Sequence, residues 1–184
     1  MKLVLISDLH GQSTTLYFLK TIIKKEKPDA IIISGDITTA GATDFFDELE
    51  KIISRSRVPA LIVWGNSDLP DAIDRIKNSK FCIHLQKVRL GSFEFFGIGE
   101  TDDALNVSNK IKNTILITHR PPDLGFLKEQ FKNAPDVHIS GHLHRKKTAA
   151  PYPSTFHISV PTLQGGEYAV FYPKTKKVEF LRAR

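Results

Sequence analysis

Several short apolar runs in this chain end in aspartate, asparagine or histidine, and this recurrence limits the possible folds more than any other feature. The most informative case is Gly141-His142-Leu143-His144, which follows a strand-like run that ends at Ser140. Two histidines separated by one residue on a tight turn can face the same metal ion. A lone His-x-His pair is a weak signal, so its meaning depends on the other strand ends.

Four other runs show the same arrangement, a buried strand-like stretch followed directly by polar residues of the types that bind metals. They are Lys2–Ser7 before Asp8 and His10, Ala30–Ser34 before Gly35 and Asp36, Ala60–Trp64 before Gly65, Asn66 and Asp68, and Thr114–Thr118 before His119. Ligands bind at the carboxyl ends of the strands in open α/β sheets. We therefore expect the polar residues at these five strand ends to form one site.

The order of elements in the first half predicts an α/β protein. Continuous apolar runs over Lys2–Ile6 and Ala30–Ser34 are typical of strands buried on both faces. One amphipathic helix is expected after an N-cap at Ser13 or Thr14, and a second over about Thr43–Ser54. This β-α-β-α-β order predicts parallel strands joined by right-handed crossovers.

The second half predicts a mixed sheet or a second sheet. Strands over Lys87–Leu90 and Phe93–Ile98 flank a hairpin signal. Residues 100–112 predict a solvated connector, with a flexible loop over the site as the alternative. The remaining expected elements are short helices over 71–78 and 124–133 and antiparallel strands over 155–160, 168–172 and 177–181. No repeat or linker interrupts the 184 residues, so we expect a single domain over 1–184.

Composition excludes few function classes. The net charge of +6 is compatible with an anionic substrate, and an ordinary soluble basic surface explains it equally well. The single cysteine, Cys82, excludes an internal disulfide. The N-terminal apolar run is too short for a signal peptide, and no run approaches the ~18 residues of a membrane helix. We expect a cytoplasmic protein without a membrane partner.

The candidate ligands are too numerous for one ion and suit two. They are Asp8, His10, Asp36, Asn66, His119, His142 and His144. Two metals ~3.5–4 Å apart can clamp the attacking and leaving oxygens of a phosphoester displacement and lower the pKa of water. One carboxylate usually bridges such a pair, and Asp36 is the candidate. Imidazole and carboxylate ligands suit divalent transition metals, with Mn expected and Fe, Zn or Ni as alternatives.

Taken together, the motifs resemble those of the calcineurin-like metallophosphoesterases, and the short length resembles the small prokaryotic phosphodiesterases of that superfamily. The matching motifs are Asp8-x-His10, Gly35-Asp36, Gly65-Asn66-x-Asp68, Thr118-His119 and Gly141-His142-x-His144, in the family's order. The resemblance implies a four-layer sandwich in which two mixed β-sheets pack face to face with helices outside.

The resemblance also implies how the ligands divide between the ions. One ion would be held by Asp8, His10 and His144, the other by Asn66, His119 and His142, and Asp36 would bridge them. Asn66 would also lie near the substrate phosphate, which makes Asn66 and Asp36 the expected catalytic residues. Asp68 would support the site from behind the ligands.

Two further positions concern the phosphate. Many members of the family have a histidine after the asparagine, where it can protonate the leaving group, but this chain has Ser67. The identity of the general acid is therefore open. Arg120 follows a candidate ligand and has the geometry to bind phosphate, although holding the turn at Pro121-Pro122 or facing solvent would explain it equally well.

The sequence favours a metal-dependent phosphoesterase that attacks a small phosphoester with hydroxide generated at a dinuclear metal centre. We expect a phosphodiesterase, with a phosphomonoesterase as the alternative. A non-catalytic interaction scaffold on the same fold is one alternative, and retention of all seven ligand types argues against it. A nuclease is another, and the compact chain has no evident nucleic-acid-binding domain. The histidines at 84, 138 and 157 match no motif, and we expect them to be structural. The oligomeric state is not predicted.

Overall fold

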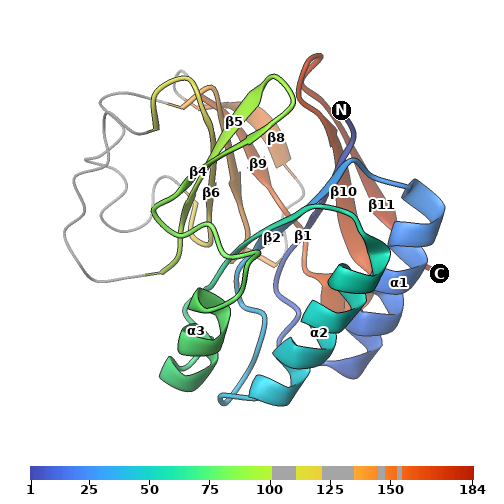
Figure 1. The fold of residues 1–184 in the computed structure, drawn as a ribbon. Helices are drawn as coiled ribbons and strands as arrows, with labels where there is room; N and C mark the ends of the chain where they lie inside the picture. Colours follow the sequence, from blue (N-terminus) through green and yellow to red (C-terminus); the bar gives the residue numbers. More distant parts are fainter. Residues whose placement is uncertain (101–110, 122–134, 145–147, 153–154) are drawn as a thin grey trace.

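The chain folds into two mixed β-sheets that pack face to face (Figure 1). The computed structural model describes residues 1–100, 111–121, 135–144, 148–152 and 155–184. Within these residues three helices cover the outer face of one sheet. The expected α/β class with two mixed sheets is confirmed, whereas the helix expected over 124–133 and most of the connector over 100–112 lie outside the described residues.

The first sheet has five strands in the order β11-β10-β1-β2-β3. Its strands are β1 (Leu3–Ile6), β2 (Ala30–Ser34), β3 (Ala60–Val63), β10 (Glu167–Tyr172) and β11 (Lys177–Arg182). The first three are parallel, while β10 and β11 are antiparallel to their neighbours. The helices α1 (Ser13–Glu26) and α2 (Thr43–Ser56) connect the parallel strands, and α3 (Pro70–Lys77) follows β3. The predicted β-α-β-α-β order of parallel strands is confirmed.

The second sheet has six strands in the order β4-β5-β6-β7-β9-β8. They are β4 (Lys87–Leu90), β5 (Phe93–Ile98), β6 (Ile115–Thr118), β7 (Val137–Ser140), β8 (Thr148–Tyr152) and β9 (Thr155–Ser159). The expectation that the strand over 155–160 is antiparallel is half wrong. That strand, β9, pairs parallel with β7 and antiparallel with β8, a strand that the sequence did not reveal. Alanine and proline are depleted in strands, so the Thr-Ala-Ala-Pro-Tyr sequence of β8 gives no strand signal.

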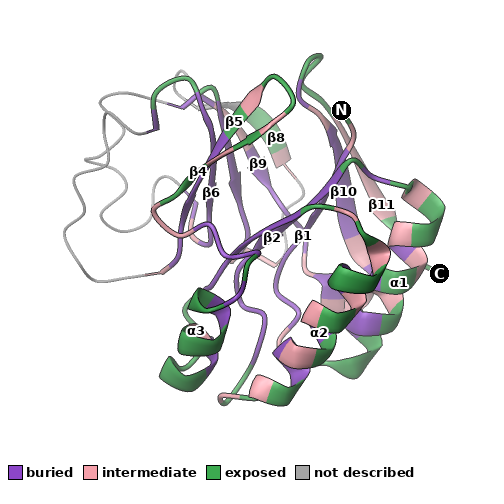
Figure 2. Ribbon diagram, in the orientation of Figure 1, coloured by how far each residue is buried: buried purple, intermediate pink, exposed green. Residues whose placement is uncertain are grey.

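The core lies in layers because successive side chains of a strand point to opposite faces. On β1, Leu3 and Leu5 pack between the two sheets, whereas Val4 and Ile6 pack under the helices. Figure 2 shows the central strands buried and the outer faces of the helices exposed. A third apolar cluster, which includes Phe96 and Leu116, lies on the other face of the second sheet. Both faces of the central strands are therefore buried, as the continuous apolar runs predicted.

The start of α1 differs from the expected capping. Gln12 occupies the N-cap position without a side-chain cap, and Ser13 lies within the helix. The reason is the preceding tight turn, in which the Gln12 N–H donates to the carbonyl of Leu9 at 3.2 Å. This turn, which carries His10, fixes the helix start, so the prediction of a cap at Ser13 or Thr14 is wrong.

The segment that follows α3 joins the two sheets along one side. Backbone bonds connect Phe81 and Ile83 to Ile62 of β3 at 2.9 and 3.1 Å, and the Leu85 N–H donates to Gly97 of β5 at 2.8 Å. The segment thus contacts both sheets through single bridges. It also holds Cys82, which is buried, as expected for a small apolar side chain.

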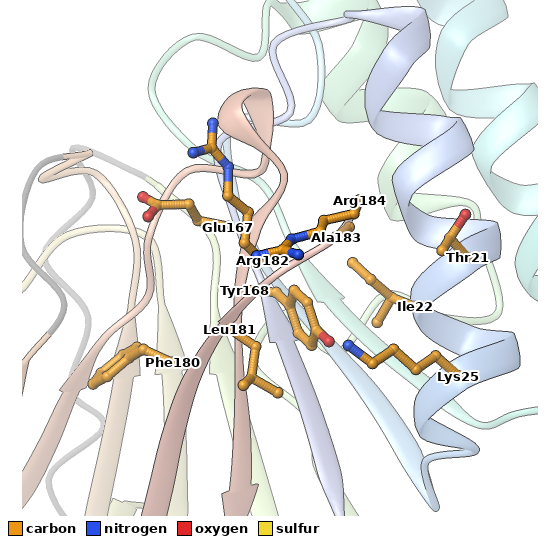
Figure 3. Close-up of a pocket in the computed structure, with 10 residues that line it drawn as sticks. All are labelled: Thr21, Ile22, Lys25, Glu167, Tyr168, Phe180, Leu181, Arg182, Ala183 and Arg184. Carbon is orange, nitrogen blue, oxygen red and sulfur yellow. The ribbon is translucent and has the colours of Figure 1, made fainter.

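A cavity of about 590 Å³ lies between α1 and the ends of β10 and β11 (Figure 3). Its lining includes Lys25, Tyr168 and Leu181, and it contains none of the seven candidate ligands. Among the described helices, none combines the length and the apolar character needed to cross a membrane.

Candidate metal centre

The parallel strands of both sheets end at one edge of the sandwich, and the candidate ligands extend from these ends. In the first sheet Asp8 and His10 follow β1, Asp36 follows β2 and Asn66 lies after β3; in the second, His119 follows β6 and His142 and His144 follow β7. The two sheets meet here through side chains, because Oδ1 of Asp8 lies 2.9 Å from Nε2 of His144. The convergence of strand ends that the sequence predicts is therefore present.

One group combines two histidines and two carboxylates. Ligand atoms of Asp8, His10, Asp36 and His144 all lie within 4.8 Å of one another. The two Nε2 atoms of His10 and His144 are 3.3 Å apart, and Nε2 of His10 is 3.6 Å from Oδ2 of Asp36. Asp8 and Asp36 are almost completely buried. A buried pair of carboxylates is costly without a compensating cation.

The hydrogen bonding of Asp8 tests whether this group fits a metal ion. Its Oδ2 accepts a bond from the His142 N–H at 3.2 Å, but its buried Oδ1 accepts none from the described residues, although His144 Nε2 lies within contact distance. An unsatisfied buried carboxylate oxygen that faces imidazole nitrogens is the arrangement expected of ligands that share a cation. Aspartate and histidine are donors for Mn, Fe, Zn and Ni, so the residues fit such an ion.

A second group is built around His119, whose side chain is fully buried. Its Nε2 lies 3.2 Å from Nδ1 of His142 and 3.3 Å from Oδ1 of Asp36, while its Nδ1 donates to the Ser34 carbonyl at 2.9 Å. This bond assigns the proton to Nδ1 and leaves Nε2 as a donor of electrons to a metal. Burial lowers the pKa of His119, but the hydrogen bond and charge of Asp36, together with the charge of Asp8, outweigh it and raise that pKa. The carboxylates of Asp36 and Asp8 therefore favour a positive charge beside His119.

Asp36 lies between the two groups, with one carboxylate oxygen toward each. Oδ1 faces His119 and Oδ2 faces His10. The Ser67 N–H donates to Oδ1 at 2.8 Å, and the Ser67 hydroxyl donates to Oδ2 at 2.9 Å. Burial raises the pKa of Asp36, but the bond and charge of His119 and the bonds from Ser67 outweigh it and hold that pKa well below its ordinary value. Asp36 therefore remains an anion placed between two sets of nitrogen donors.

The residues expected near the phosphate have other partners. The Ser67 hydroxyl contacts the carboxylate of Asp36, and Arg120 donates from Nε to Oε1 of Glu100 at 2.6 Å. Asn66, the remaining candidate ligand, is exposed in the loop between Gly65 and Asp68. Sequence reasoning did not find these contacts. Ser67 stands at the variable position of its motif and Glu100 belongs to no motif, so nothing indicated a partner for either residue.

Asp68 joins two of the ligand loops. Its Oδ1 accepts bonds from the N–H and the hydroxyl of Thr38 at 2.7 and 2.9 Å, and its Oδ2 accepts from the N–H groups of Ile37 and Gly65 at 3.2 and 2.8 Å. Burial raises the pKa of Asp68 despite these bonds. The loop that follows Asp36 also brings the Thr39 hydroxyl to 3.3 Å from Nδ1 of His10, a contact that sequence reasoning missed. Asp68 thus ties the backbone that follows Asp36 to the loop that follows β3.

The histidines that match no motif lie outside these groups. Nδ1 of His84 accepts from the Gly99 N–H at 2.9 Å, Nε2 of His138 lies 2.7 Å from the Thr118 hydroxyl, and Nε2 of His157 lies 2.8 Å from the Ser140 hydroxyl.

The backbone of the candidate ligands is unusual. Five of the seven have positive φ values between 48° and 70°: Asp8, His10, Asp36, His142 and His144. The left-handed conformation is uncommon for residues other than glycine and is concentrated at functional sites, where the surrounding structure must enforce it.

Three glycines allow the strand ends to approach closely. A Cβ at Gly35 would lie 2.6 Å from Nδ1 of His119, and one at Gly65 would lie 2.8 Å from Cγ of the same ring. His119 therefore crosses from the second sheet into a slot between two glycines of the first. A Cβ at Gly141 would overlap the Ser7 hydroxyl oxygen and lie 2.9 Å from Oδ2 of Asp8.

We expect Gly141→Ala to separate the two sheets at the site. The added methyl group must displace Ser7 or the His142 turn, which should cost about 1–3 kcal/mol of unfolding free energy and weaken metal binding. Denaturant unfolding and metal titration measure the two effects. Gly165→Ala is the matched control, because its new Cβ would meet only Arg182 Nη2, at 3.9 Å. Unchanged stability and metal binding in Gly141→Ala would contradict the predicted close contact.

The chain is similar in sequence to proteins of a known family. Residues 1–146 match the model of the calcineurin-like phosphoesterase family. The chain is 26% identical over 166 residues to a protein of Methanocaldococcus jannaschii, with 79% of this chain and 72% of the relative covered. It is 24% identical over 173 residues to a metallophosphoesterase of Helicobacter pylori, of which it spans only 44% while 78% of this chain is covered.

The fold has a solved counterpart in a crystal structure from Thermus thermophilus. The TM-score is 0.83 at 15% identity, with 100% of this chain and 99% of the other covered. The family match extends over most of the chain and includes every candidate ligand, so the resemblance inferred from the motifs is confirmed. The chain belongs to the calcineurin-like phosphoesterase family.

Proposed function

We propose that this protein is a phosphodiesterase that hydrolyses small phosphoesters with the help of two divalent transition-metal ions. The position of Asp36 carries the proposal, because its two oxygens face donors on opposite sides, His10 at 3.6 Å and His119 at 3.3 Å. Asp8 and His144 complete the first group, and His142, with Asn66 from the neighbouring loop, completes the second. When bound, such a pair of ions supplies Lewis acidity, lowering the pKa of water and neutralising charge on the phosphate.

The protein's own residues orient these donors. Ser67 holds both oxygens of Asp36, and Asp68 binds the N–H groups of Thr38 and Gly65 in the loops after β2 and β3. The Ser34 carbonyl sets the tautomer of His119. We assign Asn66 to the substrate phosphate because it is exposed beside the buried ligands. Manganese is the metal we expect, with iron, zinc and nickel as alternatives of similar ligand preference.

The absence of a histidine at position 67 supports the preference for diesters with good leaving groups. Serine is too weak an acid near neutral pH to protonate a departing alkoxide, and here its hydroxyl already donates to Asp36. The chain's resemblance to small phosphodiesterases, some of which also lack this histidine, points the same way. We therefore expect a preference for substrates whose leaving group departs without receiving a proton from residue 67.

The test combines metal analysis with a substrate panel. Protein stripped of metal and reconstituted separately with Mn²⁺, Fe²⁺, Zn²⁺ or Ni²⁺ should bind two ions per chain and hydrolyse an aryl phosphodiester faster than the matching aryl phosphomonoester. Elemental analysis and release of the aryl alcohol give the two readouts, with metal-free protein as the control. Failure of all four metals to bind or to support hydrolysis would favour the interaction scaffold. Preferential cleavage of single-stranded nucleic acid would favour the nuclease.

A further inference from the structure

The segment that follows β9 connects the two halves of the candidate centre. At its start the Val160 N–H donates to the carbonyl of Ser140, next to the His142 turn, at 2.7 Å. At its end the Leu163 N–H donates to the carbonyl of Ser7 at 2.9 Å, and the Thr162 hydroxyl donates to the carbonyl of Asp8, also at 2.9 Å. These residues lie beyond the 1–146 range that matches the family model.

The Thr162 hydroxyl binds the carbonyl of a residue in the left-handed backbone conformation. Asp8 has a φ of 55°, and its N–H donates to the carbonyl of Gly35 at 3.1 Å. Thr162 therefore binds the peptide carbonyl of Asp8 while Gly35, directly after β2, binds its N–H. With both sides fixed, the Asp8 carboxylate is directed toward the His142 N–H and His144 Nε2.

We propose that Thr162 is a positioning residue for the ion held by Asp8, His10 and His144. This inference rests on the proposed metal-dependent function. The hydroxyl of Thr162 maintains the left-handed conformation of Asp8, and the Asp8 side chain then points its unsatisfied Oδ1 toward the histidine nitrogens. Partners that orient metal ligands typically contribute 10–100-fold to metal affinity.

A purely structural role for Thr162 makes a different prediction. Its hydroxyl oxygen also accepts a bond from the Gln164 N–H at 3.3 Å at the start of the short helix η1 (Leu163–Gly165). If capping this helix were its only role, losing the hydroxyl would lower stability without singling out one metal ion. Metal affinity at each site therefore separates the two roles.

The experiment compares Thr162→Val, which keeps the shape but removes the hydroxyl, with Thr162→Ser, which keeps the hydroxyl. Mn²⁺ is titrated into metal-free protein by calorimetry, and crystals soaked in Mn²⁺ show by anomalous scattering which ion is lost. We expect Thr162→Val to bind the ion of the Asp8, His10 and His144 group about 10–100-fold more weakly. The ion of the His119 and His142 group should be less affected. Thr162→Ser should bind like the wild type.

Thr114→Val is the matched control. Thr114 is buried, and its hydroxyl also donates to a backbone carbonyl, that of Ile111 at 2.7 Å, but it lies before β6, at the opposite end of that strand from His119. This variant should lose stability and keep wild-type Mn²⁺ affinity. If valine at position 162 prevents folding, Thr162→Ala removes the hydroxyl without the branched side chain and replaces it in the comparison.

Three results would overturn the inference: wild-type Mn²⁺ affinity after loss of the Thr162 hydroxyl, equal weakening of both ions, or failure of Thr162→Ser to restore binding. Wild-type protein that binds no divalent metal would instead overturn the proposed function. The wild-type titration thus distinguishes the failure of the function from the failure of the role assigned to Thr162.

Discussion

Asp36→Asn should lose both metal ions and lower kcat for an aryl phosphodiester by on the order of 10³-fold or more. Asparagine has the same shape but no negative charge, and only one of its two terminal atoms can face a metal with a lone pair. Because the Asp36 oxygens face His10 on one side and His119 on the other, one substitution should weaken both groups. Elemental analysis and steady-state kinetics on the same preparation measure the two losses.

A surface aspartate supplies the control for this experiment. Asp47 pairs with Arg75 at 2.7 Å, and both side chains are well exposed. Exposed pairs of this kind contribute about 0–1 kcal/mol, so Asp47→Asn should retain metal, activity and nearly all stability. An active Asp36→Asn protein with full metal occupancy would show that Asp36 does not bridge two ions.

The second large effect concerns the leaving group. Without a histidine at position 67, hydrolysis should depend steeply on leaving-group pKa, so that aryl phosphodiesters react far faster than unactivated alkyl esters. General acid catalysis is typically worth ~10²–10⁴ in rate, which sets the size of the expected gap. A series of substituted aryl and alkyl esters, plotted as log(kcat/KM) against leaving-group pKa, measures this dependence.

Ser67→His should narrow that gap if its ring reaches the leaving oxygen. The substitution also removes the hydroxyl that donates to Asp36, so Ser67→Ala is required as a control for the lost bond. Metal content should be measured in both variants, because each loses the hydroxyl bond to Asp36 and we expect each to keep the bond from the N–H of residue 67. A flat leaving-group dependence in the wild type, with chemistry rate-limiting, would mean that another residue donates the proton.

The convergence of the candidate ligands within each sheet could be predicted from sequence because it follows from strand direction. Asp8, Asp36 and His119 each follow a short apolar strand, and parallel strands deliver the residues after them to the same edge. The layered core was predictable for a similar reason, since continuous apolar runs require cover on both faces.

The contacts between loops could not be predicted, because they depend on how the loops pack, both within one sheet and between the two sheets. Ser67 reaches Asp36 across 31 positions of sequence, and Thr162 reaches Asp8 across 154. Neither serine nor threonine carries a signal of such a partner, as both are common in turns. The strand β8 was missed because its composition opposes its structure: pairing with β9 stabilises a stretch that contains Pro151.

The left-handed backbone of the ligands implies a conflict between stability and chemistry. Glycine would adopt these φ values without steric cost, so a redesign that considered stability alone would replace Asp8, His10 or His144 with glycine and erase the site. Each non-glycine residue in this conformation costs about 1 kcal/mol or more, and five of them together rival the ~5–15 kcal/mol net stability of a typical domain. A ligand bound only to the folded state at 100 times its Kd contributes ~2.7 kcal/mol. The free metal concentration would then determine the stability of the folded protein as well as its activity.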